Sequence, residues 1–315
     1  MNYLTFVFLL MLGNSKEIQF HPTPAEPRVP AIFQLPRSTF LVASAEIRRA
    51  LSHTVYAVRF PSPVVTPDES NNTVHAELFR PVAASTTRRP AVVVLHILGA
   101  DFALSRYFAA RLADRGVVAL FVKLPYYGER RGDENDRRFL STDVDRSIAS
   151  MRQGVLDVRR AVAYMNSLPD VDASRVGVAG ISLGGIVGGL AAAIDPAITS
   201  AALLLAGGDL AEILWTMPEG AKYRKLWIDA GKTKADLAAL TRPLDPLTYA
   251  DRLKGKRVYM VAGKVDDTIP PSSALALWEK AGRPPIRWLD CGHYSAGGFL
   301  LPEVRRAVEF LAQAP

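Results

Sequence analysis

The most restrictive feature of this sequence is a set of short segments in which apolar residues follow one another without alternation. Such runs indicate strands that are covered on both faces, as in a parallel sheet. Helical patterns separate them: Leu104, Phe108 and Leu112 recur at a spacing of four, and residues 144–168 repeat apolar side chains at a roughly helical period. Strands and helices that alternate along the chain predict a doubly wound α/β domain with a mostly parallel sheet. The runs are residues 91–96, 117–122, 175–180, 201–206, 257–263 and 286–290.

The segments outside this alternation predict three additions to the domain. Residues 54–60 and 73–79 alternate between apolar and polar side chains, which indicates an antiparallel hairpin at an edge of the sheet. Residues 1–38 are expected to be an apolar N-terminal segment followed by an extended, Pro-rich lead-in, so that the α/β domain occupies residues 39–315. A connection of roughly fifty residues follows residue 206, too long for a plain loop. It predicts a small helical cap around residues 207–253.

Composition excludes several classes of function. The 315 residues are 49% hydrophobic and carry a net charge of +7, but the basic side chains are interleaved with acidic ones. The densest stretch, residues 129–138, is nearly balanced in charge and indicates a solvated loop, so we expect no nucleic-acid partner. The single cysteine, Cys291, excludes an internal disulfide, a thiolate zinc site and an iron–sulfur cluster. There is no H-E-x-x-H motif, and no G-x-G-x-x-G follows a predicted strand.

The first residues leave the location of the protein open. The apolar stretch of residues 3–12 is too short to span a bilayer as a helix, but it has the length of a signal-peptide core. Gly13 and Ser15 supply small residues for cleavage, whereas no Lys or Arg precedes the stretch. An exported protein, a weak membrane association through this segment, and a cytoplasmic protein with the segment packed on its domain all remain open.

Three polar side chains follow predicted strands at the points where those strands end. Ser182 comes after residues 175–180 in G-I-S-L-G-G, Asp266 comes after residues 257–263 in G-K-V-D-D-T-I-P, and His293 comes after residues 286–290 in C-G-H-Y. Ligands of open α/β sheets bind beyond the carboxyl ends of the strands. The order Ser, Asp, His is that in which α/β-hydrolases supply a catalytic triad.

The chemistry requires these residue types. A serine hydroxyl is a poor nucleophile without a base in hydrogen-bond reach, which an imidazole provides near neutral pH. A carboxylate fixes the tautomer of that imidazole. Gly180 and Gly184 would let the chain turn sharply around Ser182 and let the next helix approach the sheet. For the carboxylate, spacing favours Asp266 over its neighbour Asp267, and Asp209 is a third candidate after the strand at 201–206.

These motifs carry a family resemblance. G-I-S-L-G-G, G-K-V-D-D-T-I-P and C-G-H-Y together resemble the α/β-hydrolase fold, and A-V-V-V-L-H-I-L-G-A-D at residues 91–101 is similar to the dienelactone hydrolase family. The resemblance covers roughly residues 75–313, with the lead-in and the cap outside it. It implies hydrolysis of a small-molecule ester through a covalent intermediate, with no metal and no organic cofactor.

The sequence departs from that family at three points. Ser182 stands where the family has a cysteine nucleophile, and His96 stands where it has a glutamate. The family also has an arginine a few residues after the catalytic histidine, whereas the stretch H-Y-S-A-G-G that begins at His293 contains none. These departures favour a serine esterase of the carboxylesterase kind over cleavage of a dienelactone. A peptidase or amide hydrolase of the same fold, and a hydrolase-fold protein that only binds, remain as alternatives.

The remaining site residues come from the same comparison of motifs. The resemblance implies an oxyanion hole made by the backbone N–H of Leu183 and a second N–H from the turn after His96. The family favours Ile97 as the second donor, whereas the general H-G-x pattern of hydrolases favours Leu98. Four further residues are candidates for the substrate pocket, although His96 is also a candidate for a structural brace of the turn. They are His96, Tyr126, Tyr127 and Trp215.

Overall fold

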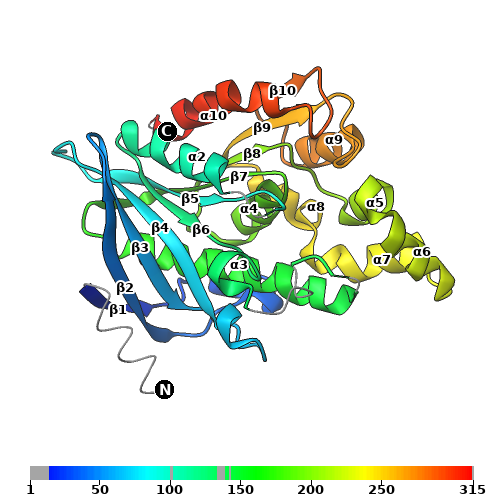
Figure 1. The fold of residues 1–315 in the computed structure, drawn as a ribbon, viewed down its shortest axis with the longest axis horizontal. Helices are drawn as coiled ribbons and strands as arrows, with labels where there is room; N and C mark the ends of the chain where they lie inside the picture. Colours follow the sequence, from blue (N-terminus) through cyan, green and yellow to red (C-terminus); the bar gives the residue numbers. More distant parts are fainter. Residues whose placement is uncertain (1–13, 100–101, 133–138, 142, 314–315) are drawn as a thin grey trace.

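One mixed sheet of ten strands runs through the part of the chain that the computed structural model describes, namely residues 14–99, 102–132, 139–141 and 143–313. The strands lie side by side in the order β1-β2-β3-β4-β6-β5-β7-β8-β9-β10 (Figure 1). Their bounds are β1 Asn14–Phe20, β2 Ser38–Arg49, β3 His53–Pro61, β4 Thr73–Pro81, β5 Arg89–Leu95, β6 Val118–Val122, β7 Val171–Ile181, β8 Ser200–Leu204, β9 Arg257–Gly263 and β10 Ile286–Leu289.

The predicted α/β-hydrolase fold is confirmed. Strands β6, β5, β7, β8, β9 and β10 pair in parallel, and every predicted apolar run overlaps one of them. Because parallel strands share one direction, their carboxyl ends lie at the same edge of the sheet. The predicted hairpin is also present, since β3 and β4 pair in antiparallel register from His53–Pro81 to Pro61–Thr73.

The outer edge of the sheet lies two strands beyond the predicted hairpin. β2 pairs with β3, and β1 pairs with β2 from Asn14–Ser44 to Phe20–Ser38. The beginning of the Pro-rich lead-in is extended as predicted, but it forms an edge strand of the sheet. Ile18 is the one buried residue of β1, so the apolar alternation that would reveal a strand is almost absent there.

Helices cover both faces of the sheet (Figure 1). On one face α2 and α10 pack with one apolar cluster, and on the other face α3, α4 and α9 pack with a larger one. Most of the predicted cap region is helical as well and extends beyond the carboxyl edge of the sheet as α5, α6 and α7 (Figure 1). The helices are α2 Ala103–Asp114, α3 Val144–Asn166, α4 Leu183–Ile194, α5 Leu210–Thr216, α6 Ala221–Asp229, α7 Lys234–Thr241, α8 Pro246–Tyr249, α9 Pro271–Lys280 and α10 Gly297–Ala312.

The N-terminal apolar stretch of residues 3–12 lies outside the described residues. Within the described ranges, every helix is too short or too polar to cross a bilayer.

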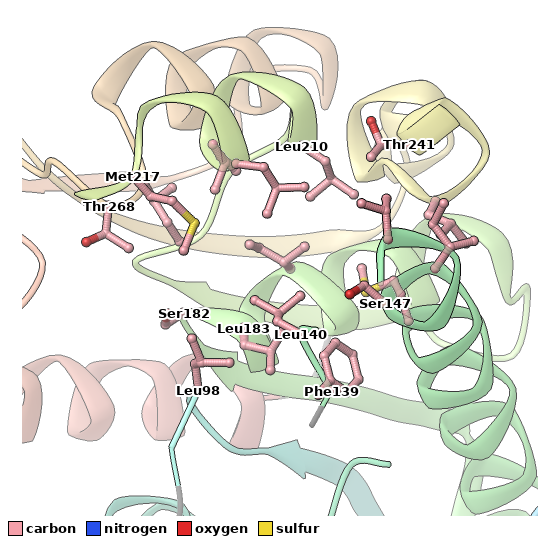
Figure 2. A pocket seen from close by; sticks show the side chains of 18 residues that line it. Leu98, Phe139, Leu140, Ser147, Ser182, Leu183, Leu210, Met217, Thr241 and Thr268 are labelled. Carbon is pink, nitrogen blue, oxygen red and sulfur yellow. The ribbon is translucent and has the colours of Figure 1, made fainter. Parts of the chain in front are cut away.

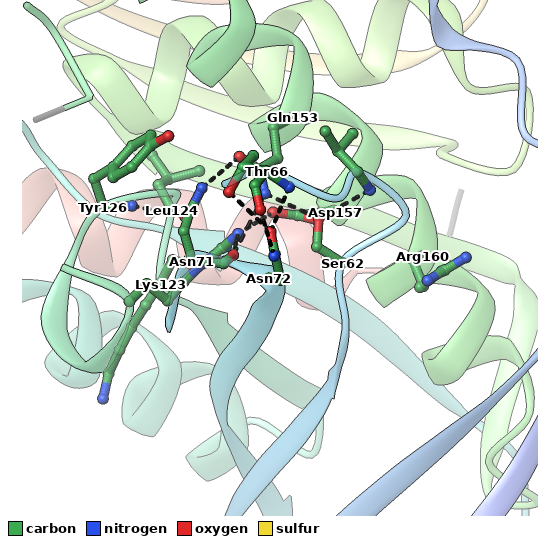
Figure 3. A network of polar contacts seen from close by, with 12 residues as sticks. Ser62, Thr66, Asn71, Asn72, Lys123, Leu124, Tyr126, Gln153, Asp157 and Arg160 are labelled. Carbon is green, nitrogen blue, oxygen red and sulfur yellow. Dashed lines mark hydrogen bonds and ion pairs between the residues drawn. The ribbon is translucent and has the colours of Figure 1, made fainter. Parts of the chain in front are cut away.

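A buried polar network joins the β3–β4 connection, the segment after β6 and α3 (Figure 3). Arg130 is fully buried and forms an ion pair of 2.8 Å with Asp157 of α3. The same guanidinium donates to the backbone carbonyls of Asn71 and Lys123. Arg130 is therefore an exception to the solvated loop expected over residues 129–138: Glu129 and Gly132 are exposed, and residues 133–138 lie outside the described residues. The mixed charge of residues 129–138 does not show that one of the arginines is buried in the core.

A second buried ion cluster attaches the lead-in to the core. Arg159 of α3 donates to both carboxylate oxygens of Glu26, at 2.8 and 2.7 Å, and to Asp195 after α4 at 2.9 Å. Burial opposes ionisation of Glu26, but hydrogen bonds from the Arg159 guanidinium and from the Leu35 N–H hold the pKa of Glu26 below its ordinary value. The ionised carboxylate therefore stabilises the folded state.

In the turn between β7 and α4, backbone packs closely against backbone. A Cβ on Gly180 would lie 2.2 Å from the backbone carbon and oxygen of Gly184, and a Cβ on Gly184 would lie 2.6 Å from the Leu95 carbonyl oxygen. These glycines are needed for close approach of backbones, since the positive φ of the turn, 53°, belongs to Ser182. The sequence argument assigned the sharp turn to the glycines, and the structure places it on the serine.

We predict that Glu26→Gln destabilises the fold in a pH-dependent way. A folded-state pKa below the ordinary 4.5 means that the stabilisation is present above about pH 4.5 and is lost as the pH falls through the folded value. At pH 7 the variant should lose about 1–3 kcal/mol of unfolding free energy, because the buried guanidinium loses its charged partner. Urea unfolding at pH 7 and pH 4 measures this. The control is Glu17→Gln on the exposed face of β1, and an equal loss at both pH values would contradict the prediction.

We predict that Gly180→Ala disrupts the turn. The new methyl group meets backbone atoms at 2.2 Å that cannot rotate away, so the unfolding free energy should fall by more than about 3 kcal/mol. Gly297→Ala is the matched control, because its Cβ meets nothing within 4 Å and alanine favours helices by up to about 1 kcal/mol. Chemical denaturation of both variants checks the difference. Equal stability of the two would refute the close approach.

Candidate active site

The structure brings Ser182 and His293 into contact. Ser182 precedes α4 with φ 53° and ψ −119°, a conformation that non-glycine residues rarely adopt and that lifts the hydroxyl above the end of the sheet. Its Oγ lies 2.8 Å from Nε2 of His293, which is carried by the loop after β10. The N-terminus of α4 faces the same point, where a helix favours negative charge.

Asp266 lies behind the imidazole, and its two rivals lie elsewhere. Its Oδ2 is 2.8 Å from Nδ1 of His293, while Oδ1 accepts the backbone N–H groups of Thr268 and Ile269 at 3.0 and 2.7 Å. The carboxylate is therefore held in one orientation and its side chain is 1% exposed. Asp267 is exposed, and Asp209 caps α5 by accepting the Glu212 N–H.

His96 is fully buried beneath the turn that follows β5 and does not line the cavity beside Ser182. Its Nε2 accepts the Leu124 N–H at 3.0 Å, so Nδ1 carries the proton and donates to the Ile97 carbonyl at 2.7 Å. Burial lowers the pKa of His96 to about 4, which keeps the ring neutral at neutral pH. The pocket-lining prediction for His96 is therefore corrected, and the alternative of a brace describes its contacts.

The backbone around Ile97 is oriented by two contacts. The His96 carbonyl oxygen faces the start of α4, where it would lie 2.7 Å from a Cβ on Gly184. In a trans peptide the N–H points opposite to the preceding C=O, so the Ile97 N–H points away from α4. The His96 ring donates a hydrogen bond to the Ile97 carbonyl, which therefore points toward that ring. By the same rule the Leu98 N–H points away from the His96 ring.

An apolar cavity of about 110 Å³ opens beside Ser182 (Figure 2). Leu98, Ser182 and Leu183 lie at one end of it, and Leu210 and Met217 of the cap region lie across from them (Figure 2).

Of the eighteen described side chains that line the cavity, fourteen are apolar, four are Ser or Thr, and none is charged. The cavity wall is therefore uncharged and almost wholly apolar.

The other predicted pocket residues lie around neighbouring cavities. Tyr126 and Tyr127 line a second, more polar cavity of about 410 Å³, together with Arg131 and Glu219. Trp215 lines a third cavity, between the cap region and the start of α3, and Ser182 does not line that cavity. The structure thus places both tyrosines and Trp215 near the site but not beside the serine hydroxyl.

Sequence reasoning missed most of the wall of the first cavity. Ile148 and Met151 come from α3, Ile213 comes from α5, and Leu244 follows α7. These residues lie in helical segments, where apolar side chains recur at the helical period. That period does not distinguish a side chain that faces the core from one that faces a cavity. The helical period of residues 144–168 indicates that one face of this helix is apolar. It does not show which element packs opposite that face.

Tyr294 connects the histidine loop to the cap region. Its ring lies edge-on to that of His293, with centroids 5.6 Å apart, and its hydroxyl donates to Glu219. That hydrogen bond raises the pKa of Tyr294 to about 12, so the phenol stays protonated and the contact persists at neutral pH.

Comparison with solved structures agrees with this architecture. Acetyl xylan esterase from Paenibacillus sp. R4 superimposes with a TM-score of 0.70 at 18% identity, over 98% of this chain and 99% of that one. Acetyl xylan esterase 1 from Thermoanaerobacterium sp. JW/SL YS485 gives a TM-score of 0.67 at 20% identity, over 85% and 87% of the two chains. At such identities the likeness establishes the fold alone.

Sequence comparison gives a relative and a family. An uncharacterised protein of Mycobacterium tuberculosis, from strains H37Rv and CDC 1551, is 29% identical over 246 residues. The match covers 76% of this chain and 57% of the mycobacterial protein. The sequence profile of the dienelactone hydrolase family matches residues 74–281, which include Ser182 and Asp266. This chain belongs to the dienelactone hydrolase family.

Proposed function

We propose that this protein hydrolyses carboxylic esters through an acyl-enzyme intermediate, with Ser182 as nucleophile, His293 as general base and acid, and Asp266 as the group that orients His293. The observation that carries the proposal is the pair of 2.8 Å contacts from Ser182 Oγ to His293 Nε2 and from His293 Nδ1 to Asp266 Oδ2. Family membership supports it, because a lactone is a cyclic ester.

The steps follow from this geometry. His293 Nε2 takes the hydroxyl proton as Ser182 Oγ attacks the ester carbonyl carbon, and Asp266 stabilises the imidazolium that forms. The imidazolium then gives its proton to the departing alcohol oxygen, which leaves an acyl group on Ser182. Water attacks that acyl group with His293 as base, and the carboxylic acid is released.

The negative oxygen of the intermediate needs two backbone donors. We assign Leu183 as the first, because its N–H begins α4 directly after the nucleophile. For the second we favour Leu98 over Ile97, because the Ile97 N–H points away from α4 while Leu98 lines the same cavity as Ser182. His96 is then a positioning residue, since its Nδ1–H holds the Ile97 carbonyl on the opposite side of the peptide.

We predict that Ser182→Ala lowers kcat on p-nitrophenyl butyrate by at least about 10³-fold and abolishes labelling by a fluorophosphonate, because no nucleophile remains. Asp266→Asn should lower kcat by about 10⁴-fold, because the amide supports the wrong imidazole tautomer. Asp267→Asn is the matched control: its side chain is exposed, and kcat should stay within about threefold of wild type. Wild-type turnover by the Ser182 variant would remove the proposal.

We predict that His96→Leu lowers kcat by about 10²-fold with a smaller change in KM, because the Leu98 N–H stabilises charge that develops in the transition state. His96→Gln should recover part of the loss, since its amide can accept from Leu124 and donate to Ile97. Steady-state kinetics of folded variants tests this. A stable His96→Leu protein with wild-type kcat would show that the ring does not position a donor.

A further inference from the structure

We propose that the apolar cavity beside Ser182 is an acyl pocket, so that the substrates are esters of short to medium apolar carboxylic acids rather than acetyl esters. The inference rests on the proposed function and adds the substrate class. Its basis is the uncharged wall and the position of Ser182 at one end of the cavity (Figure 2).

The position of His293 decides which part of the ester enters the cavity. The imidazolium must reach the alcohol oxygen to protonate it, so the leaving group lies on the His293 side of the carbonyl carbon. Among the described residues that line the cavity, none comes from the loop that carries His293. The group inside the cavity is therefore the acyl chain.

The alcohol side has a different character. Tyr294, next to His293, donates to Glu219, and Glu219 lines the second cavity of about 410 Å³ with Arg131 and two tyrosines. The Tyr294–Glu219 hydrogen bond joins this larger and more polar space to the histidine loop, so we assign the alcohol to it. Selectivity should therefore reside in the acyl chain.

The size of the cavity sets the chain length. An apolar cavity of about 150 Å³ is large enough for benzene, so about 110 Å³ corresponds to roughly four carbon atoms beyond the carbonyl. Each methylene that enters an apolar site contributes about 0.8 kcal/mol, or roughly a fourfold gain in kcat/KM. An acyl group longer than the cavity must leave its end in water or displace the wall.

The first test is a series of p-nitrophenyl esters from acetyl to dodecanoyl. We expect kcat/KM to rise roughly 15-fold from acetyl to butanoyl, to peak between butanoyl and hexanoyl, and to fall beyond octanoyl. A parallel series of butanoyl esters with methyl, hexyl and glyceryl alcohols should vary less. A steeper dependence on the alcohol than on the acyl group would overturn the assignment.

The second test shortens the cavity. Ile148 lines it from α3, and Figure 2 shows its neighbour Ser147 at the end far from Ser182. Ile148→Trp should lower the ratio of hexanoyl to acetyl kcat/KM at least about fivefold. Ala149→Trp, on the exposed side of the same helix, is the matched control and should keep the wild-type ratio.

The outcomes separate this inference from the proposed function. Acetyl hydrolysis without a rise along the acyl series would overturn the acyl pocket and leave the triad in place. No hydrolysis of any ester, with no fluorophosphonate labelling, would overturn both. The acyl series uses the wild-type protein, so it tests the inference even if the Ile148→Trp protein does not fold.

Discussion

The backbone of Ser182 is the constraint on which the rest of the site depends. Its φ of 53° and ψ of −119° cost a non-glycine residue about 1–3 kcal/mol, so the surroundings must hold it. They do so through contact of backbones: Gly180 lies against Gly184, Gly184 lies against the end of β5, and the Ser182 N–H donates to Leu204 at 2.9 Å. Relaxing the turn would require α4 to leave the sheet.

The same contacts couple the nucleophile to the turn after β5. The His96 carbonyl meets α4 at Gly184, and the His96 side chain holds both Ile97 and Leu124. The segment that contains Leu124 is held in turn by Asn71 and Arg130 in the buried network (Figure 3). A buried ion pair is costly to desolvate, but with its hydrogen bonds made it fixes one arrangement of the chain. The rigid support of the site is therefore polar and lies beneath it, while its cavity is apolar.

The parts of this structure that the sequence predicts are those with local signals. The central strands are apolar runs, and Ser182, Asp266 and His293 follow such runs, so their meeting point follows from the direction of the strands. The edge strand β1 lacks such a signal because its neighbours cover only Ile18. Arg130 lies in a run of mixed charge, and its burial depends on Asp157, which is far along the chain.

The cavity wall shows the same limit at the functional site. Its residues come from the turn after β5, from α3, from α4 and from the cap region, and their meeting depends on how these elements pack. The aromatic residue chosen from the sequence, Trp215, lines another cavity, whereas the aliphatic Leu210 and Ile213 line the cavity beside Ser182. A large aromatic residue is readily chosen from a sequence as a candidate for a pocket wall, but an acyl chain needs only aliphatic surface.

An apolar wall has a second consequence for the chemistry. When an acyl chain fills the cavity, water is displaced from the side of the carbonyl opposite His293, and the local dielectric falls. Hydrogen bonds from the Leu183 and Leu98 N–H groups to a developing oxyanion are then stronger than they would be in water. An acyl group that leaves the cavity partly empty admits water and loses part of this stabilisation. The acyl chain length that best fills the cavity is thus also the one for which the two backbone donors stabilise the oxyanion most strongly. Selectivity for the acyl chain and the rate of reaction therefore arise from the same contact.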